Sequence, residues 1–86
     1  MWYNVDMLGK LKLESIIRRF KKHGYACMLC LPDHYTIWKF GCRDKVVRIR
    51  VCLNERDAVK IEVLVKDKVI PVSNFKQAIE VYLKHI

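Results

Sequence analysis

Glycine and proline are scarce in this 86-residue sequence, which contains three Gly and two Pro. Disordered and low-complexity chains are usually rich in both, so a chain with 52% hydrophobic residues and so few of them is expected to fold. No apolar run approaches the roughly 20 residues that a membrane-spanning helix needs. The N-terminus also lacks the basic start and apolar run of a secretory signal. We therefore expect one domain over residues 1–86, located in the cytoplasm and with no membrane partner.

Acidic residues are the second shortage, since nine Asp and Glu stand against 17 Lys and Arg, for a net charge of +8. Between residues 10 and 22 there are six basic side chains, and Glu14 is the only acidic one. A helix whose charges serve only solvation usually mixes both signs. The one-signed excess therefore favours a polyanionic partner.

Catalytic motifs are missing as well. The sequence has no glycine-rich phosphate loop, and its three histidines, His23, His34 and His85, are far apart. No serine or cysteine stands at a spacing that suggests a nucleophile paired with a histidine. We therefore expect a protein that is not an enzyme and that carries no cofactor.

The four cysteines are Cys27, Cys30, Cys42 and Cys52. Cys27 and Cys30 form a CxxC pair inside the apolar run Tyr25–Leu31, which has the composition of a strand. Strand residues three apart point to opposite faces, so this pair could not hold one zinc ion. We expect reduced cysteines in the core, and a zinc site or a disulfide remains as an alternative.

Two amphipathic helices are expected at the ends of the domain. The first covers residues 10–23, with an apolar stripe of Leu13, Ile16, Ile17 and Phe20, and Gly24 ends it. Ser73 is expected to cap the second, over residues 73–86. Residues 1–8 are expected as a short strand or as an arm that packs Trp2 onto the domain, separated from the first helix by Gly9.

Between the helices, alternating apolar residues predict short strands, and acidic turn residues recur every 11 or 12 positions. The expected strands are Tyr25–Leu31, Tyr35–Phe40, Lys45–Leu53, Ala58–Lys66 and a short Val69–Ile70 that Pro71 stops. The predicted fold is α+β, a four- to five-stranded antiparallel meander with both helices packed on one face. The expected core residues are Leu13, Ile16, Ile17, Phe20, Val47, Ile49, Val51, Ile61, Val63, Ile79 and Tyr82.

The other sheet face should be basic. If Trp38 and Phe40 point into the core, Tyr35, Ile37 and Lys39 share the uncovered face with strand arginines and lysines. Together with the first helix they would form a continuous positive surface for DNA or RNA, with low sequence specificity and with Tyr35 stacking on a base. The predicted nucleic-acid contacts are Lys12, Arg18, Arg19, Lys22, Tyr35, Lys39, Arg48, Arg50 and Lys60.

A protein–protein interaction module is the alternative function. It would be a small regulator or inhibitor of the kind that viruses and mobile elements encode, and it would use a sheet edge or the Trp2–Tyr3 arm. A homodimer is also expected, formed by edge pairing or by the uncovered sheet face with Tyr35, Ile37 and Leu64.

Overall fold

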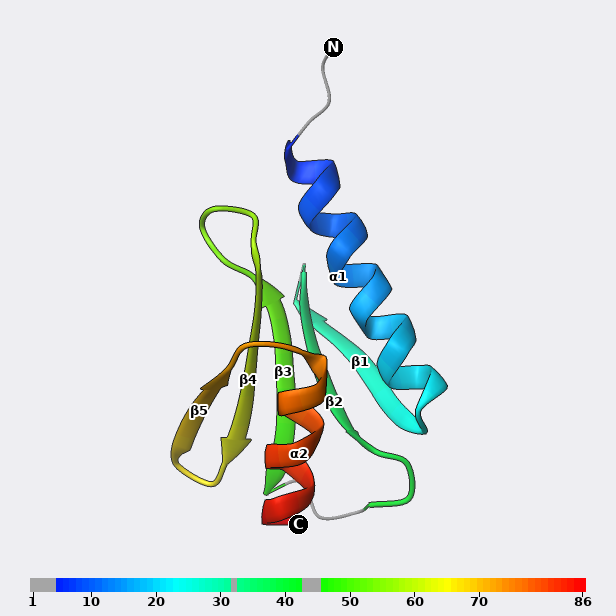
Figure 1. Cartoon of the computed structure of the whole chain (residues 1–86), viewed down its shortest axis with the longest axis vertical. Coiled ribbons are helices and arrows are strands. Elements are labelled where there is room, and N and C mark those ends of the chain that lie inside the picture. The colour runs from blue at the N-terminus through cyan, green and yellow to red at the C-terminus, as the bar shows by residue number, and fades with distance from the viewer. Residues whose placement is uncertain (1–4, 32, 43–45) are drawn as a thin grey trace.

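A computed structural model describes residues 5–31, 33–42 and 46–86 of the protein. A helix, five strands and a second helix follow one another along the chain (Figure 1). Their bounds are α1 (Val5–Lys22), β1 (Tyr25–Leu31), β2 (His34–Lys39), β3 (Val47–Leu53), β4 (Val59–Val65), β5 (Lys68–Val72) and α2 (Phe75–His85). The predicted α+β meander is confirmed.

The sheet has the strand order β1-β2-β3-β4-β5, and every neighbouring pair is antiparallel. Apolar side chains of β3 alternate with polar ones, so Ile49 and Val51 lie on the face that α1 and α2 cover. Leu13 and Phe20 of α1 and Tyr82 of α2 belong to the same buried cluster as these two residues. Both helices therefore pack on one face, and the second face is left open.

The core is rich in aromatic contacts where the two helices meet. The rings of Phe20 and Phe75 lie 4.6 Å apart, and Tyr25 packs edge-on against Phe20 and Tyr82. The Tyr82 hydroxyl also accepts a hydrogen bond of 2.9 Å from the backbone N–H of Lys39, which ties α2 to the end of β2. Most predicted core residues are buried, and Ile16 and Ile79 are only partly so.

Helix α1 starts earlier than expected. It begins at Val5, so the short strand predicted over residues 1–8 is wrong for residues 5–8, and Gly9 lies inside the helix. Gly9 is needed for a close approach, since a Cβ at this position would collide with the backbone carbonyl of Asp57 in the β3–β4 loop. The Trp2–Tyr3 arm lies outside the described residues.

Two predicted boundaries near the C-terminus are also wrong. Asn74 rather than Ser73 caps α2, because its side-chain oxygen accepts a hydrogen bond of 2.8 Å from Gln77 N–H. The N–H of Ser73 instead donates to the Gln77 side chain at 2.7 Å. Strand β5 continues through Pro71 to Val72. An edge strand tolerates proline because it has a neighbouring strand on one side only, so the lack of an N–H donor need not break a ladder hydrogen bond.

The two faces of β2 are the reverse of the prediction. Ile37 is fully buried and lies opposite Ile49, whereas Phe40 is 77% exposed. Tyr35 pairs with Val51 and packs against the core, so Tyr35, Ile37 and Lys39 belong to the helix-covered face. Alternation has a period of two, and one wrong assignment therefore reverses every residue of the strand.

Candidate nucleic-acid interface

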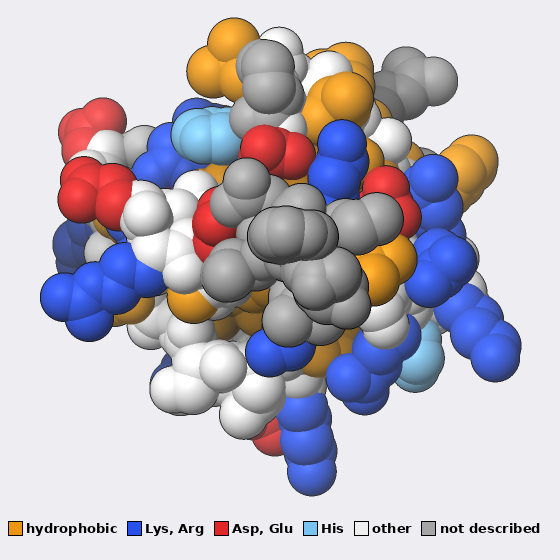
Figure 2. All heavy atoms as spheres, turned by 90° about the horizontal axis from the view of Figure 1, so that it is seen from above, with side chains coloured by type: hydrophobic (Ala, Val, Ile, Leu, Met, Phe, Trp, Pro, Cys, Tyr) orange, Lys and Arg blue, Asp and Glu red, His pale blue; other side chains and the backbone are white. Residues whose placement is uncertain are grey.

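The basic residues of α1 and those of β3 and β4 form two groups that the sheet separates. One group lies on α1, on the helix side, and the other lies on the open face of β3 and β4. Figure 2 shows Lys and Arg side chains gathered over α1, along the right-hand side of the view. The single continuous surface predicted from the sequence is therefore wrong. The α1 group, called the α1 ridge below, is Lys10, Lys12, Arg18, Arg19, Lys21 and Lys22.

All six side chains of the α1 ridge are exposed. Within residues 5–31, 33–42 and 46–86, none of them forms an ion pair, because both ion pairs of this part of the chain involve Glu62 on the open face. Glu14 is also exposed and does not reach Arg18, four residues further along the same helix. The positive charge of α1 therefore faces solvent uncompensated by these residues.

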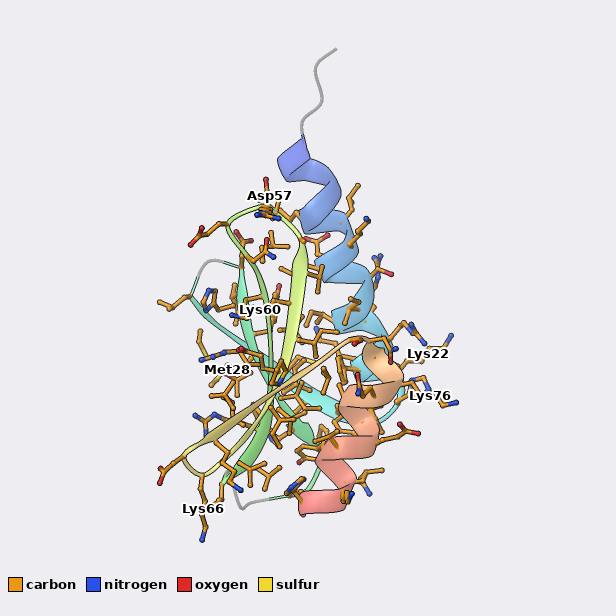
Figure 3. The ribbon with its side chains drawn as sticks, turned by 60° about the vertical axis from the view of Figure 1, so that its left-hand side comes forward. Lys22, Met28, Asp57, Lys60, Lys66 and Lys76 are labelled. Atoms are coloured by element: carbon orange, nitrogen blue, oxygen red, sulfur yellow. The ribbon has the colours of Figure 1, made fainter. Side chains whose placement is uncertain are left out.

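The α1 ridge continues onto the start of α2. The guanidinium of Arg19 lies 4.3 Å from the centre of the Phe75 ring, and the His23 ring packs edge-on against the same phenyl at 5.1 Å. Lys76 comes next on α2, whose first turn holds no acidic residue. Figure 3 shows Lys22 and Lys76 projecting on the same side of the molecule, so the ends of the two helices form one basic surface.

The open sheet face is electrostatically different because Glu62 lies among its cations. Arg50 donates to one Glu62 oxygen from Nη2 at 2.7 Å and from Nε at 3.1 Å, and Lys60 Nζ is 3.4 Å from the other oxygen. Burial alone would raise the pKa of Glu62, but hydrogen bonds and charges from Arg50 and Lys60 outweigh it and lower the pKa. Two predicted phosphate contacts are thus already engaged by a carboxylate.

Apolar side chains occupy much of the rest of the open face. Trp38 pairs with Ala26, and Met28 pairs with Thr36 in the next row of the sheet. Leu64, opposite Arg48, is only 6% exposed. Figure 3 labels Met28 and Lys60 on the side of the sheet away from the helices. This face is therefore a mixture of apolar and charged side chains, with less unpaired positive charge than the α1 ridge.

The predicted contacts divide accordingly. Lys12, Arg18, Arg19 and Lys22 lie together on α1, while Arg48, Arg50 and Lys60 lie on the open face. Tyr35 and Lys39 are on the helix-covered face of β2. Sequence reasoning missed Lys76 and the role of Glu62, although the alternation in β4 already placed Glu62 on the same face as Lys60.

The cysteines are all free thiols, and their positions differ from the expectation of core residues. Only Cys52 is buried, and Cys30 is exposed. Cys27 lies 3.9 Å from the Ile17 carbonyl under α1, while Cys30 lies 3.2 Å from the Thr36 hydroxyl on the open face, so the CxxC pair does point to opposite faces. Burial raises the pKa of the Cys27 and Cys52 thiols. Among the described residues, no three His, Cys, Asp or Glu side chains could hold a metal ion together.

Comparison of the chain with protein-family models, with curated proteins and with solved structures found no match. In the part of the chain that the structure describes, neither helix has the length and apolar character required to cross a membrane. The interpretation of the site therefore depends on the chemistry of its own residues.

Proposed function

We propose that the protein binds nucleic acid, DNA or RNA, by holding phosphate groups along the α1 ridge and Lys76. The observation that carries this proposal is the set of six exposed α1 cations that form no ion pair within the described residues. Cations in this state gain the full benefit of releasing counterions from a phosphate chain. Arg50 and Lys60, in contrast, would have to break their ion pairs with Glu62 before they could bind a phosphate.

The length of the ridge suits a phosphate chain. From Lys10 to Lys22 the helix rises about 18 Å, and phosphates of one DNA strand follow one another every 3.4 Å or so along the axis. Several phosphates therefore fall within reach of the flexible lysine and arginine side chains at once. The outermost uncharged ridge neighbours, Leu11 and Ser15, offer no aromatic plane for stacking on a base. Binding through phosphates alone gives low sequence specificity.

The test compares two triple variants that remove the same charge from different faces. One is Lys12→Gln with Arg18→Gln and Lys22→Gln on α1. Its matched control is Arg48→Gln with Lys60→Gln on the open sheet face and Lys66→Gln in the β4–β5 turn. Fluorescence anisotropy with labelled DNA and RNA at about 50 mM salt gives the affinities. We expect the α1 variant to lose affinity at least about tenfold and the control to lose much less.

Two results would contradict the proposal. The first is negligible affinity of the unaltered protein for every nucleic acid at this salt concentration, which would favour the protein–protein interaction module instead. The second is an equal loss in both triple variants, which would mean that total charge and not the α1 ridge determines binding. Circular dichroism of each variant establishes that the fold is retained.

A further inference from the structure

The two edges of the sheet are unlike. Strand β5 carries Lys68 and Pro71, a charge and a missing backbone donor that hinder pairing with a further strand. Strand β1, at the other edge, has no charged residue and no proline. Its second half is exposed, with Met28 49%, Leu29 56% and Leu31 60% accessible to solvent. An uncharged, apolar and exposed edge of this kind is a template for pairing with another strand.

The hydrogen-bond pattern shows which backbone groups of β1 point outward. Phe40 N–H donates to the Gly24 carbonyl at 2.9 Å, so these two residues form a hydrogen-bonded pair at the start of the β1–β2 ladder. Such pairs alternate with non-bonded ones in antiparallel sheets, which directs Ala26 and Met28 toward β2. The N–H and C=O groups of Cys27 and Leu29 therefore point away from β2, toward the free edge.

We propose that β1 pairs antiparallel with β1 of a second copy of this chain, about a two-fold axis near Leu29. The two five-stranded sheets would then join into one continuous sheet. Outward groups of Leu29 in each copy would exchange hydrogen bonds, and the half-exposed Met28 and Leu31 side chains would be covered.

A second copy suits this edge better than a different protein does. Each copy carries a net charge of +8, yet β1 itself has no charged residue, so the two paired strands place no like charges opposite each other. An apolar strand in antiparallel pairing is its own complement, whereas recognition of a foreign strand usually needs charged or polar groups that discriminate between partners. The β1 strands of two copies are therefore both apolar and suited to pair with each other.

The size of the contact predicts a weak dimer. With the axis at Leu29, residues 27–31 of the two copies overlap over about 17 Å, and a sheet edge is about 10 Å thick, so each copy contributes on the order of 200 Å². This is less than the roughly 800 Å² per partner of a standard interface. We therefore expect dissociation in the micromolar range, with monomer and dimer both present at laboratory concentrations.

Such a dimer would also change the basic surface, and this consequence depends on the proposed function. A two-fold axis perpendicular to the joined sheet keeps both helix-covered faces on the same side. Helix α1 crosses the sheet from the β3–β4 loop to β1, where its Ile17 carbonyl lies near Cys27, so the C-terminal parts of both α1 ridges would flank the axis on one side. The dimer would offer a nucleic acid two ridges where the monomer offers one.

The experiment measures the mass of the full chain by analytical ultracentrifugation under reducing conditions, from low micromolar to near-millimolar concentration. We expect the mass to rise from 10.3 kDa toward twice that value. Leu29→Lys should weaken association at least tenfold. Val69→Lys, which adds the same charge to the 50% exposed Val69 on the β5 edge, should leave association unchanged. In the unaltered protein, the amides of Cys27 and Leu29 should gain protection from hydrogen exchange as concentration rises.

A mass of 10.3 kDa at every concentration would overturn the proposal, and so would a dimer whose Cys27 and Leu29 amides stay unprotected. The exchange measurement needs no substitution, so the test holds even if Leu29→Lys fails to fold. Mass and amide protection are measured without nucleic acid. A failure of the proposed function would therefore leave them unaffected, and a monomer that still binds DNA or RNA would contradict the dimer alone.

Discussion

Ion pairing with Glu62 distinguishes the basic residues of the open sheet face from those of α1, which are free to bind phosphate. The residue is 6% exposed, and its carboxylate accepts hydrogen bonds from Arg50, its cross-strand neighbour, while Lys60 lies within ion-pair distance. One acidic side chain thereby forms ion pairs with two basic side chains of the open face. No comparable carboxylate serves the α1 ridge among the described residues, which is why charge of the same sign has different consequences on the two sides of the sheet.

The free energy of unfolding should depend on pH through the interaction of Glu62 with Arg50 and Lys60. Because the folded-state pKa of Glu62 is lowered, its contribution is present above the ordinary glutamate pKa and is lost as pH falls through the folded value. We expect Glu62→Gln to lower the free energy of unfolding by about 1–2 kcal/mol at neutral pH, since it removes a charge-assisted hydrogen bond. The difference between the two proteins should shrink in acid, as measured by urea denaturation at a series of pH values. A constant difference down to strongly acidic pH would contradict this assignment.

At the scale of elements, Gly9 shows that a glycine in a helix can be a packing requirement. The β3–β4 loop reaches α1 at this position, and Asp57 in that loop has a positive φ of 59°. Asn54 holds the loop by accepting hydrogen bonds from the N–H groups of Arg56 and Ala58 at 2.8 and 3.0 Å. The first half of α1 therefore contacts a hydrogen-bonded turn as well as the sheet.

Gly9→Ala should destabilise the protein, although alanine is the better helix former. Propensity alone would stabilise the helix by about 1 kcal/mol, whereas a methyl group forced against a backbone carbonyl costs about 1–3 kcal/mol. We expect a net loss in the free energy of unfolding, measured by urea denaturation. Ser15→Ala, at an exposed position of the same helix, is the control and should be neutral or slightly stabilising. A stabilising Gly9→Ala would mean that the loop does not pack against α1.

The sequence was sufficient for the elements but not for their contacts. The stripe of α1 and the alternation of β3 and β4 are strong periodic signals, so the order of elements and most of the core were predicted correctly. Strand β2 carries large apolar residues on both faces, Ile37 on one and Trp38 on the other. Only its register with β3 decides which face is covered.

The candidate site was partly predictable for the same reason. The α1 cations follow directly from helical spacing, and they lie together as expected. The contact of Glu62 with Arg50 depends on a pairing across strands, which connects residues 12 positions apart and is invisible to a local pattern, whereas its contact with Lys60 follows from alternation within β4. The approach of Asp57 to Gly9 is equally non-local.

At the scale of the whole molecule, the helix side carries the unpaired cations of the α1 ridge, while the open sheet face has a smaller positive excess because Glu62 offsets part of its charge. If the α1 ridge and Lys76 engage about five phosphates, the logarithm of affinity for duplex DNA should fall against the logarithm of salt concentration with a slope of about −4 to −5. The triple α1 variant should reduce the steepness by about 3. A salt titration of anisotropy measures both, and a slope near zero in the unaltered protein would contradict phosphate binding.

The unlike edges of the sheet also limit how far association can proceed. A protein with two open edges can add copies at both ends without limit, which leads to fibres. Here Lys68 and Pro71 hinder strand pairing at the β5 edge. Pairing through β1 therefore uses, in each partner, the one edge of the described sheet that can readily accept another strand. Assembly would stop at two chains. The exposed apolar strand β1 would promote aggregation only in the monomer, where it has no partner strand on its free edge.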